Sequence, residues 1–80
     1  MTTKLNCDIV EGLMPTEKIA RIESADGKLE EVFVSNENIS GNKLIASEIG
    51  RRSGEVLVEL PRESASGRWR MWVKESSIEG

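Results

Sequence analysis

The chain contains no histidine, no tyrosine and a single cysteine among its 80 residues. Histidine is the commonest general base and the commonest metal ligand in proteins, and the one cysteine, Cys7, allows neither a cysteine cluster nor a disulfide within the chain. No phosphate-binding glycine loop or other catalytic motif is present either. We therefore expect a non-enzymatic protein that holds no cofactor and no metal.

Long apolar runs are also missing. No stretch approaches the ~20 residues of a membrane span, and Asn6, Asp8 and Glu11 interrupt the N-terminal segment where a secretory signal would need an apolar run. A lone Cys7 stays reduced inside a cell. The sequence thus predicts a cytoplasmic protein with no membrane contact.

The charge is mildly acidic, with a formal net charge of −3 and a pI near 5.0. Residues 1–42 carry four bases and eight acids, whereas residues 43–80 carry seven bases and six acids. This net negative charge opposes non-specific electrostatic binding to nucleic acid. A local basic patch is still conceivable, because the second half holds Arg51, Arg52, Arg62, Arg68 and Arg70.

Length and composition favour one small domain over residues 1–80. The chain is 38% hydrophobic and 31% charged, a globular balance. A domain of this size buries roughly 60–65% of its unfolded surface. One compact core, without a deep pocket, is the expected result.

The two halves of the chain resemble each other. Residues 31–41 resemble residues 70–80 at an offset of 39, and residues 23–27 resemble residues 63–67 at an offset of 40. The copies would run over 4–41 and 43–80, with two one-residue gaps and nine identities. Duplication and chance similarity both remain open at this point.

Each half has the pattern of a β-hairpin. Ser24-Ala25-Asp26-Gly27 and Ser64-Ala65-Ser66-Gly67 combine small polar residues with a final glycine, as tight turns with a positive φ require. Strand-like runs precede the turns at 18–22 and 55–60 and follow them at 29–35 and 68–74. Single helical turns are expected at 35–39 and 74–78.

Alternation within these strands predicts which side chains face the core. Trp69, Met71 and Val73 are expected inward, as are Val32 and Val34 in the first half. The outward set would then contain Glu31, Phe33, Ser35, Arg68, Arg70, Trp72 and Lys74. Phe33 and Trp72 occupy matching outward positions in the two halves.

Two segments are less clear. Residues 43–50 fit a short helix, through Leu44, Ile45, Glu48 and Ile49, but also a strand through Ile45, Ser47 and Ile49, and their shortness favours the strand. Residues 5–10 place Leu5, Cys7 and Ile9 on one strand face, where Cys7 would be a small buried hydrophobe. Residues 50–54 form a polar, glycine-bounded loop.

About six short strands with almost no helix predict an all-β fold, either a small antiparallel barrel or a compact sandwich. The segment Gly-Arg-Trp-Arg-Met-Trp-Val at 67–73, followed by Lys-Glu-Ser-Ser-Ile at 74–78, resembles the closing part of SH3-like barrels, in which a strand leads through a 3₁₀ turn to an aliphatic residue. The resemblance implies an SH3-like barrel. It implies no proline-rich ligand, because the chain has no tyrosine.

The outward aromatic residues supply the candidate binding site: Phe33, Trp72, Arg70, Lys74 and Arg68. Three interpretations compete. Trp72 could simply cover apolar surface between the stems of Arg70 and Lys74. It could instead form a protein-binding site with Phe33, for an unknown partner or a second copy of the chain. Finally, the Trp and Arg side chains could bind single-stranded nucleic acid.

Overall fold

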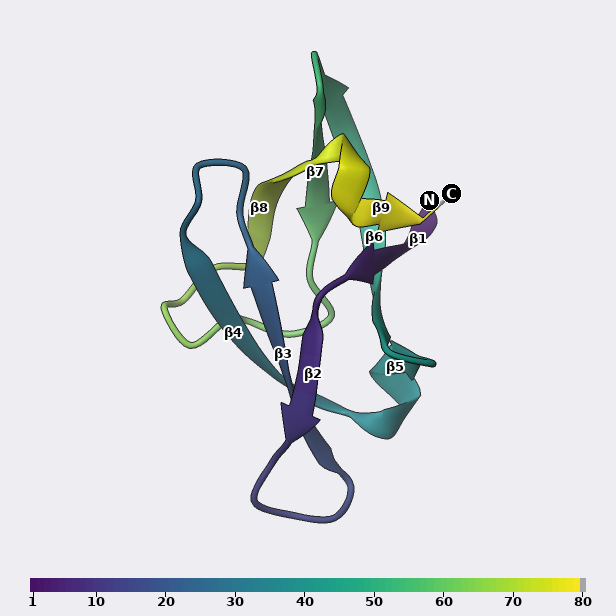
Figure 1. Ribbon diagram of the computed structural model, residues 1–80, viewed down its shortest axis with the longest axis vertical. Coiled ribbons are helices and arrows are strands. Elements are labelled where there is room, and N and C mark those ends of the chain that lie inside the picture. Colours follow the sequence, from purple (N-terminus) through teal and green to yellow (C-terminus); the bar gives the residue numbers. More distant parts are fainter. Residues whose placement is uncertain (80) are drawn as a thin grey trace.

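Nine β-strands and two 3₁₀ helices make up the regular structure of residues 1–79, the part of the chain that the computed structural model describes (Figure 1). In chain order they are β1 (Thr2–Asn6), β2 (Asp8–Glu11), β3 (Glu17–Glu23), β4 (Leu29–Ser35), η1 (Asn36–Asn38), β5 (Ile39–Ser40), β6 (Lys43–Arg52), β7 (Glu55–Glu59), β8 (Arg70–Lys74), η2 (Glu75–Ser77) and β9 (Ile78–Glu79). All the strand pairings are antiparallel. The predicted all-β class is confirmed, and η1 and η2 lie where helical turns were expected.

The strands form two sheets. The larger has the order β8-β7-β6-β1-β9, with β5 also paired to β6, and the smaller has the order β2-β3-β4. β1 and β2 are separated only by Cys7, so one length of chain enters both sheets. By the strand pairings of residues 1–79, neither sheet closes into a barrel.

Both sheets contribute to a single hydrophobic core. Along β4, Val32 and Val34 are buried while Phe33 between them is exposed, and along β8 Met71 and Val73 are buried on either side of the half-buried Trp72. Strand alternation produces this pattern, because successive side chains point to opposite faces. The buried hydrophobic residues are Leu5, Ala20, Ile22, Val32, Val34, Leu44, Ala46, Val56, Val58, Leu60, Met71 and Val73.

β6 settles the ambiguity at residues 43–50 in favour of a strand, but with the opposite face inward. Leu44 and Ala46 are the buried residues, whereas Ile45 is half-buried. Counted from Leu44 and Ala46, alternation already places Ile49 on the outer face, where it is 42% exposed. A register shift between Glu48 and Gly50 then aligns Gly50 with Leu57. A β-bulge of this kind inserts an unpaired residue and breaks the alternation. β6 also continues to Arg52, so the expected loop at 50–54 shrinks to a turn at residues 53–54.

The two predicted turns have the same hydrogen bonds. The Gly27 amide donates to the Ser24 carbonyl at 2.9 Å, and the Gly67 amide donates to the Ser64 carbonyl at the same distance. Both glycines have a positive φ, 86° and 90°. Glycine is required here because residues with a Cβ rarely adopt this conformation.

Each turn also contacts the edge strand of the other sheet. The Ala25 amide donates to the carbonyl of Trp72 in β8 at 2.8 Å, and the Ala65 amide donates to the carbonyl of Glu31 in β4 at 2.7 Å. These two reciprocal bonds connect the sheets along their edge strands β8 and β4, where no strand pairing joins them. They also cover part of two edge strands that would otherwise expose unpaired backbone groups.

The halves of the chain follow the same order of elements: a long strand or strand pair, a hairpin, a 3₁₀ helix and a two-residue strand. Leu5 of β1 pairs directly with Leu44 of β6, which is its partner in the sequence alignment. The Ala20–Val32 pair of the smaller sheet has its counterpart in Val58–Met71 of the larger. Duplication of the sequence stays a prediction.

Trp69 does not lie in the core, as was expected from alternation, but is 55% exposed. β8 begins one residue later, at Arg70. The Leu60 amide donates to the Trp69 carbonyl at 2.8 Å, so the backbone is held although the strand has not begun. Outside a regular strand, alternation no longer determines which way a side chain faces.

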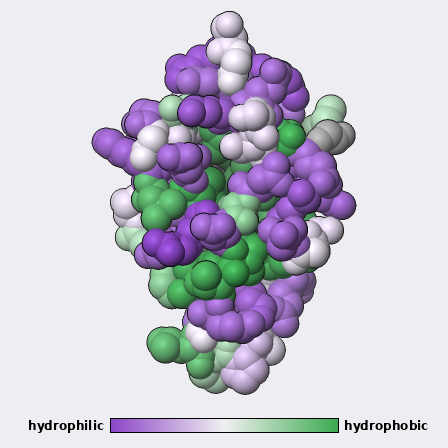
Figure 2. Space-filling view, in the orientation of Figure 1, coloured by the Kyte–Doolittle hydropathy of each residue, from purple (hydrophilic) through white to green (hydrophobic). Residues whose placement is uncertain are grey.

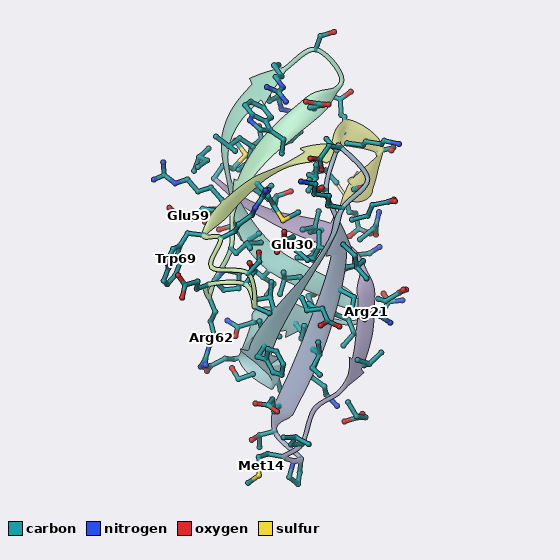
Figure 3. The ribbon with its side chains drawn as sticks, turned by 90° about the vertical axis from the view of Figure 1, so that its left-hand side faces the viewer. Met14, Arg21, Glu30, Glu59, Arg62 and Trp69 are labelled. Carbon is teal, nitrogen blue, oxygen red and sulfur yellow. The ribbon has the colours of Figure 1, made fainter. Side chains whose placement is uncertain are left out.

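Glu30 of β4 is a buried carboxylate, 6% exposed, that joins the two hairpins (Figure 3). It accepts hydrogen bonds from the hydroxyls of Ser66 at 2.5 Å and Ser64 at 3.0 Å, and the Arg68 guanidinium lies 3.6 Å away. The pKa of the Glu30 carboxyl lies below its ordinary value, mainly because of the hydrogen bond from Ser66 and further because of the hydrogen bond from Ser64 and the charge of Arg68. Buried charge is tolerated here because it is hydrogen-bonded and paired.

Glu30→Gln should therefore destabilise the fold by about 1–3 kcal/mol at pH 7, because charge-assisted hydrogen bonds are replaced by weaker neutral ones. A lowered folded-state pKa contributes stability above the ordinary carboxyl pKa of about 4.3, and this contribution is lost as the pH falls through the folded value. Urea titrations at pH 7 and pH 3 should show a difference between wild type and variant that shrinks at pH 3.

The matched control is Glu23→Gln, a neutralised carboxylate on the exposed end of β3. We expect this substitution to change the free energy of unfolding by less than about 0.5 kcal/mol at either pH. Equal effects of the two substitutions would contradict the structural role of Glu30.

Candidate functional site

An exposed row of apolar side chains crosses the outer face of the smaller sheet. The register pairs Val10 of β2 with Ile19 of β3, and Ile19 with Phe33 of β4. Cross-strand partners share a face, so the three side chains form one continuous row, called the apolar row below. Val10 is 40% exposed and Phe33 42%, while Ile19 between them is half-buried.

Charged and polar residues border the apolar row. On one side the next outward row is Asp8, Arg21 and Glu31, in which the Arg21 and Glu31 side chains lie 3.3 Å apart. On the other side, Glu17 pairs with Ser35. Figure 2 shows a hydrophobic band across the lower half of this face, over β2, β3 and β4, between hydrophilic regions. An apolar strip with a polar border is the usual anatomy of a recognition surface.

The loop between β2 and β3 extends this surface to the lower end of the molecule (Figure 1). Leu13 is 93% exposed and Met14 61%. Met14 and Phe33 line the same shallow hollow, together with Thr16 and Arg62. The apolar row and these two loop residues together are called the apolar end.

Hydrogen bonds hold the loop in place. The Glu17 carboxylate accepts from the Leu13 amide at 3.0 Å, and the Glu17 amide donates to the Met14 carbonyl, also at 3.0 Å. Gly12 allows this packing, since a Cβ at that position would lie 2.9 Å from the Glu17 carbonyl oxygen. Leu13 and Met14 are thus presented outward by a backbone that is already ordered, which reduces the entropy lost on binding.

The corresponding row of the larger sheet is closed off. There the register aligns Gly50, Leu57 and Trp72. The Arg52 guanidinium carbon lies 4.0 Å from the centroid of the Trp72 ring, and Arg52 is held by Glu55 at 2.6 Å. Stacking over the ring face is a favourable cation–π geometry. One row is therefore bare and the other covered by an ion-paired arginine.

The predicted pairing of Phe33 and Trp72 in one site is not found. The two residues lie on different sheets and line different hollows, that of Trp72 being formed with Asp26, Arg52 and Arg68. One interpretation expected Trp72 to cover apolar surface and to make a cation–π contact with Arg70 or Lys74. The cation–π contact is present, but it is made by Arg52. Strand pairing brings Arg52 to the ring from β6, a contact between residues distant in sequence.

The predicted basic residues are largely ion-paired. Arg68 lies 3.6 Å from Glu30, and Arg70 lies 3.1 Å from Glu59, whereas the exposed Lys74 has no ion pair among the described residues. Arg51 contacts both Glu48 and Glu75 at 2.7 Å. Among the arginines of the second half, Arg62 alone has no carboxylate within 4.0 Å in the described residues. Pairing of this kind leaves little uncompensated positive charge on the surface.

Cys7 is half-buried against the core, between β1 and β2. Burial raises the pKa of its thiol above the ordinary value. A raised pKa keeps the thiol protonated near neutral pH, so Cys7 lacks the thiolate that nucleophilic reactivity requires.

Sequence reasoning missed most of the apolar end. It singled out Phe33, but not Val10, Leu13 or Met14. The available signal was the dipeptide Leu13-Met14 beside Pro15, apolar residues within a segment that had to be a turn. Turns are normally polar, so this departure from the rule could have been noticed.

Comparisons with protein-family models, with curated proteins and with solved structures yield no significant match for the chain. Within residues 1–79, no helix is long and apolar enough to cross a membrane. No group of three acidic or cysteine side chains in the same range is arranged to hold a metal ion.

Arg52→Ala should uncover the Trp72 ring. In a Trp69→Phe background, where Trp72 is the remaining tryptophan, we expect stronger acrylamide quenching and an emission shift to longer wavelength. Loss of the cation–π contact should cost about 0.5–1 kcal/mol of stability. Arg62→Ala in the same background is the control, and a spectrum unchanged by both substitutions would contradict the covering role of Arg52.

Proposed function

We propose that the protein is a non-enzymatic interaction module that binds a protein partner through its apolar end. The observation that carries the proposal is the contrast between two corresponding sheet rows: Trp72 is covered by Arg52, whereas Phe33 is bare and continues into the exposed residues Leu13 and Met14. Because no side chain of residues 1–79 stacks on Phe33 in the way that Arg52 stacks on Trp72, the apolar row is the better candidate for burial by a partner protein.

The physical gain from such a partner is substantial. Complete burial of a fully exposed Leu, Met or Phe side chain contributes about 1.5–3 kcal/mol. Leu13, at 93% exposed, can gain nearly all of this, and Met14 and Phe33, at 61% and 42%, a corresponding part. The ordered loop lowers the entropic cost. The partner surface that fits is apolar at its centre and polar at its margin, to match Arg21 and Glu31 beside the row.

Single-stranded nucleic acid is the weaker alternative. It would rely on Trp72 beside Arg52 and Arg68, which share a hollow. However, the Trp72 ring is already stacked on by Arg52, and both arginines have carboxylate partners. Phosphates would have to displace these carboxylates in a protein of net charge −3.

The proposal extends to the setting of the module. The reduced Cys7 fits a cytoplasmic location. The strand β8, the 3₁₀ helix η2 and Ile78 follow one another as in the closing part of SH3-like barrels, so a distant relation to that class is part of the proposal at the level of fold.

Phe33→Ser and Leu13→Ser should each weaken partner binding by about tenfold or more, because central apolar residues dominate interface energies. The measurement is affinity capture from lysate with quantitative mass spectrometry, followed by binding of each purified candidate to wild type and variants. Sedimentation velocity in parallel shows whether the partner is a second copy of the chain.

The control for capture is Lys74→Ser, an exposed substitution on β8 of the other sheet. It should leave binding unchanged. A partner whose affinity falls with Lys74→Ser but not with Phe33→Ser or Leu13→Ser would contradict the assignment of the apolar end.

A poly-dT oligonucleotide tests the alternative function. We expect dissociation constants weaker than about 10⁻⁴ M even at low salt, the weak limit of ordinary non-specific binding. Fluorescence anisotropy with a labelled oligonucleotide measures this. Micromolar binding that falls steeply with salt and is lost in Trp72→Ala would favour nucleic acid instead.

A further inference from the structure

β6 has a stretch with no strand on one of its sides. β1 pairs with residues 43–47 along one side of β6. On the other side, β5 pairs with Lys43 and Leu44, and β7 pairs from Ser47 onward. Among the described residues, Ile45 and Ala46 therefore have a strand neighbour on one side only.

The gap arises because the chain leaves the sheet after β7. Leu60 still bonds to the Trp69 carbonyl, but Pro61 follows and has no amide hydrogen with which to continue the ladder. Beyond Pro61 the chain turns into the loop that carries Ser64 and Ser66. The opposite border of the gap is η1, with Glu37 and Asn38.

A hollow of about 480 Å³ occupies this gap. Its apolar lining consists of Ile45, Ala46, Leu60, Pro61 and Trp69. Trp69 and Glu59 lie beside each other at the edge of the molecule in Figure 3. The charged residues of the lining, within the described part of the chain, are Glu37 and Glu59, both acidic.

We propose that this hollow binds an extended peptide segment of a partner protein, in which basic residues alternate with apolar ones. An extended segment that enters the gap can form main-chain hydrogen bonds with residues 45–46 only, because β5 and β7 occupy the same side of β6 at either end. Its alternate side chains can enter the adjoining pocket. The apolar side chains would pack on Trp69 and Pro61. The basic ones would meet Glu37 and Glu59, which determine the sign of charge that the hollow accepts.

Glu59 already has a neighbour, since the Arg70 guanidinium lies 3.1 Å from it. Both side chains are well exposed, at 43% and 61%, and exposed ion pairs contribute only about 0–1 kcal/mol. A peptide lysine or arginine can therefore replace Arg70 at low cost. Glu37 has no basic side chain within 4.0 Å in residues 1–79.

The first half of the chain contains the corresponding gap, which acts as an internal comparison. There, among residues 1–79, Asn6 and Cys7 have no strand neighbour on the side of the β1–β2 segment where β9 pairs with β1 and β3 pairs with β2. The hollow beside them is lined by Asp8, Arg21, Glu23 and Leu29. It has no aromatic residue and contains an arginine, so a basic peptide should not bind to it.

The test uses a blocked octapeptide of alternating lysine and valine, titrated into ¹⁵N-labelled protein. We expect saturable amide shifts at 45–46, 59–60 and 69, and no such shifts at 6–8. Trp69→Ala should weaken the affinity by about tenfold or more. Glu37→Gln together with Glu59→Gln should weaken it several-fold and flatten its dependence on salt.

Trp72→Phe is the matched control, because Trp72 lies outside this hollow, and it should leave the affinity unchanged. Absence of binding at millimolar peptide would overturn the proposal. So would equal affinity for an octapeptide of alternating glutamate and valine, or unchanged affinity in Trp69→Ala. The proposed function at the apolar end is tested by a different set of variants, so either conclusion can fail without the other.

Discussion

The pairing of β1 with β6 is the constraint on which the rest of the structure depends. Leu5 and Leu44 are paired directly opposite each other, and both are completely buried. β1 continues through Cys7 into β2 of the smaller sheet, and β6 continues into the hairpin with β7. One central pair of strands therefore fixes where both hairpins begin, and the two hairpins can close over a single core only when this register is kept.

The second level of organisation is the contact between each turn and the opposite sheet. Ala25 and Ala65 donate to edge strands β8 and β4 in turn, and Glu30 accepts from the hydroxyls of the 64–67 turn. These hydrogen bonds pair backbone and side-chain polar groups between each turn and the edge strand of the other sheet, although the edge strands β4 and β8 do not form a continuous hydrogen-bonded ladder. In an 80-residue chain, which can bury only a small core, such bonds specify how the two sheets are arranged.

Equivalent positions in the two halves have different surroundings, and these differences locate the candidate functions. Phe33 and Trp72 occupy matching outward positions, yet only Trp72 receives a covering arginine. β6 and the β1–β2 segment each contain a stretch with a strand neighbour on one side only. Of the two hollows beside these stretches, the one at Ile45 and Ala46 has an aromatic residue and a purely acidic rim. Since the backbone arrangement is shared, side-chain chemistry is what distinguishes the two surfaces.

The sequence by itself determined the β class, the two hairpins, the turn glycines at 27 and 67, and the burial of Val32, Val34, Met71 and Val73. These follow from local rules, because alternation and the φ of a turn involve only neighbouring residues. Tertiary structure alone decided that Arg52 covers Trp72, that Leu44 and Ala46 form the inward face of β6, that Trp69 is exposed, and that Leu13 and Met14 extend a row begun on β4. Each of these depends on strand register or on where a sheet ends, and residues distant in sequence meet only after the chain has folded.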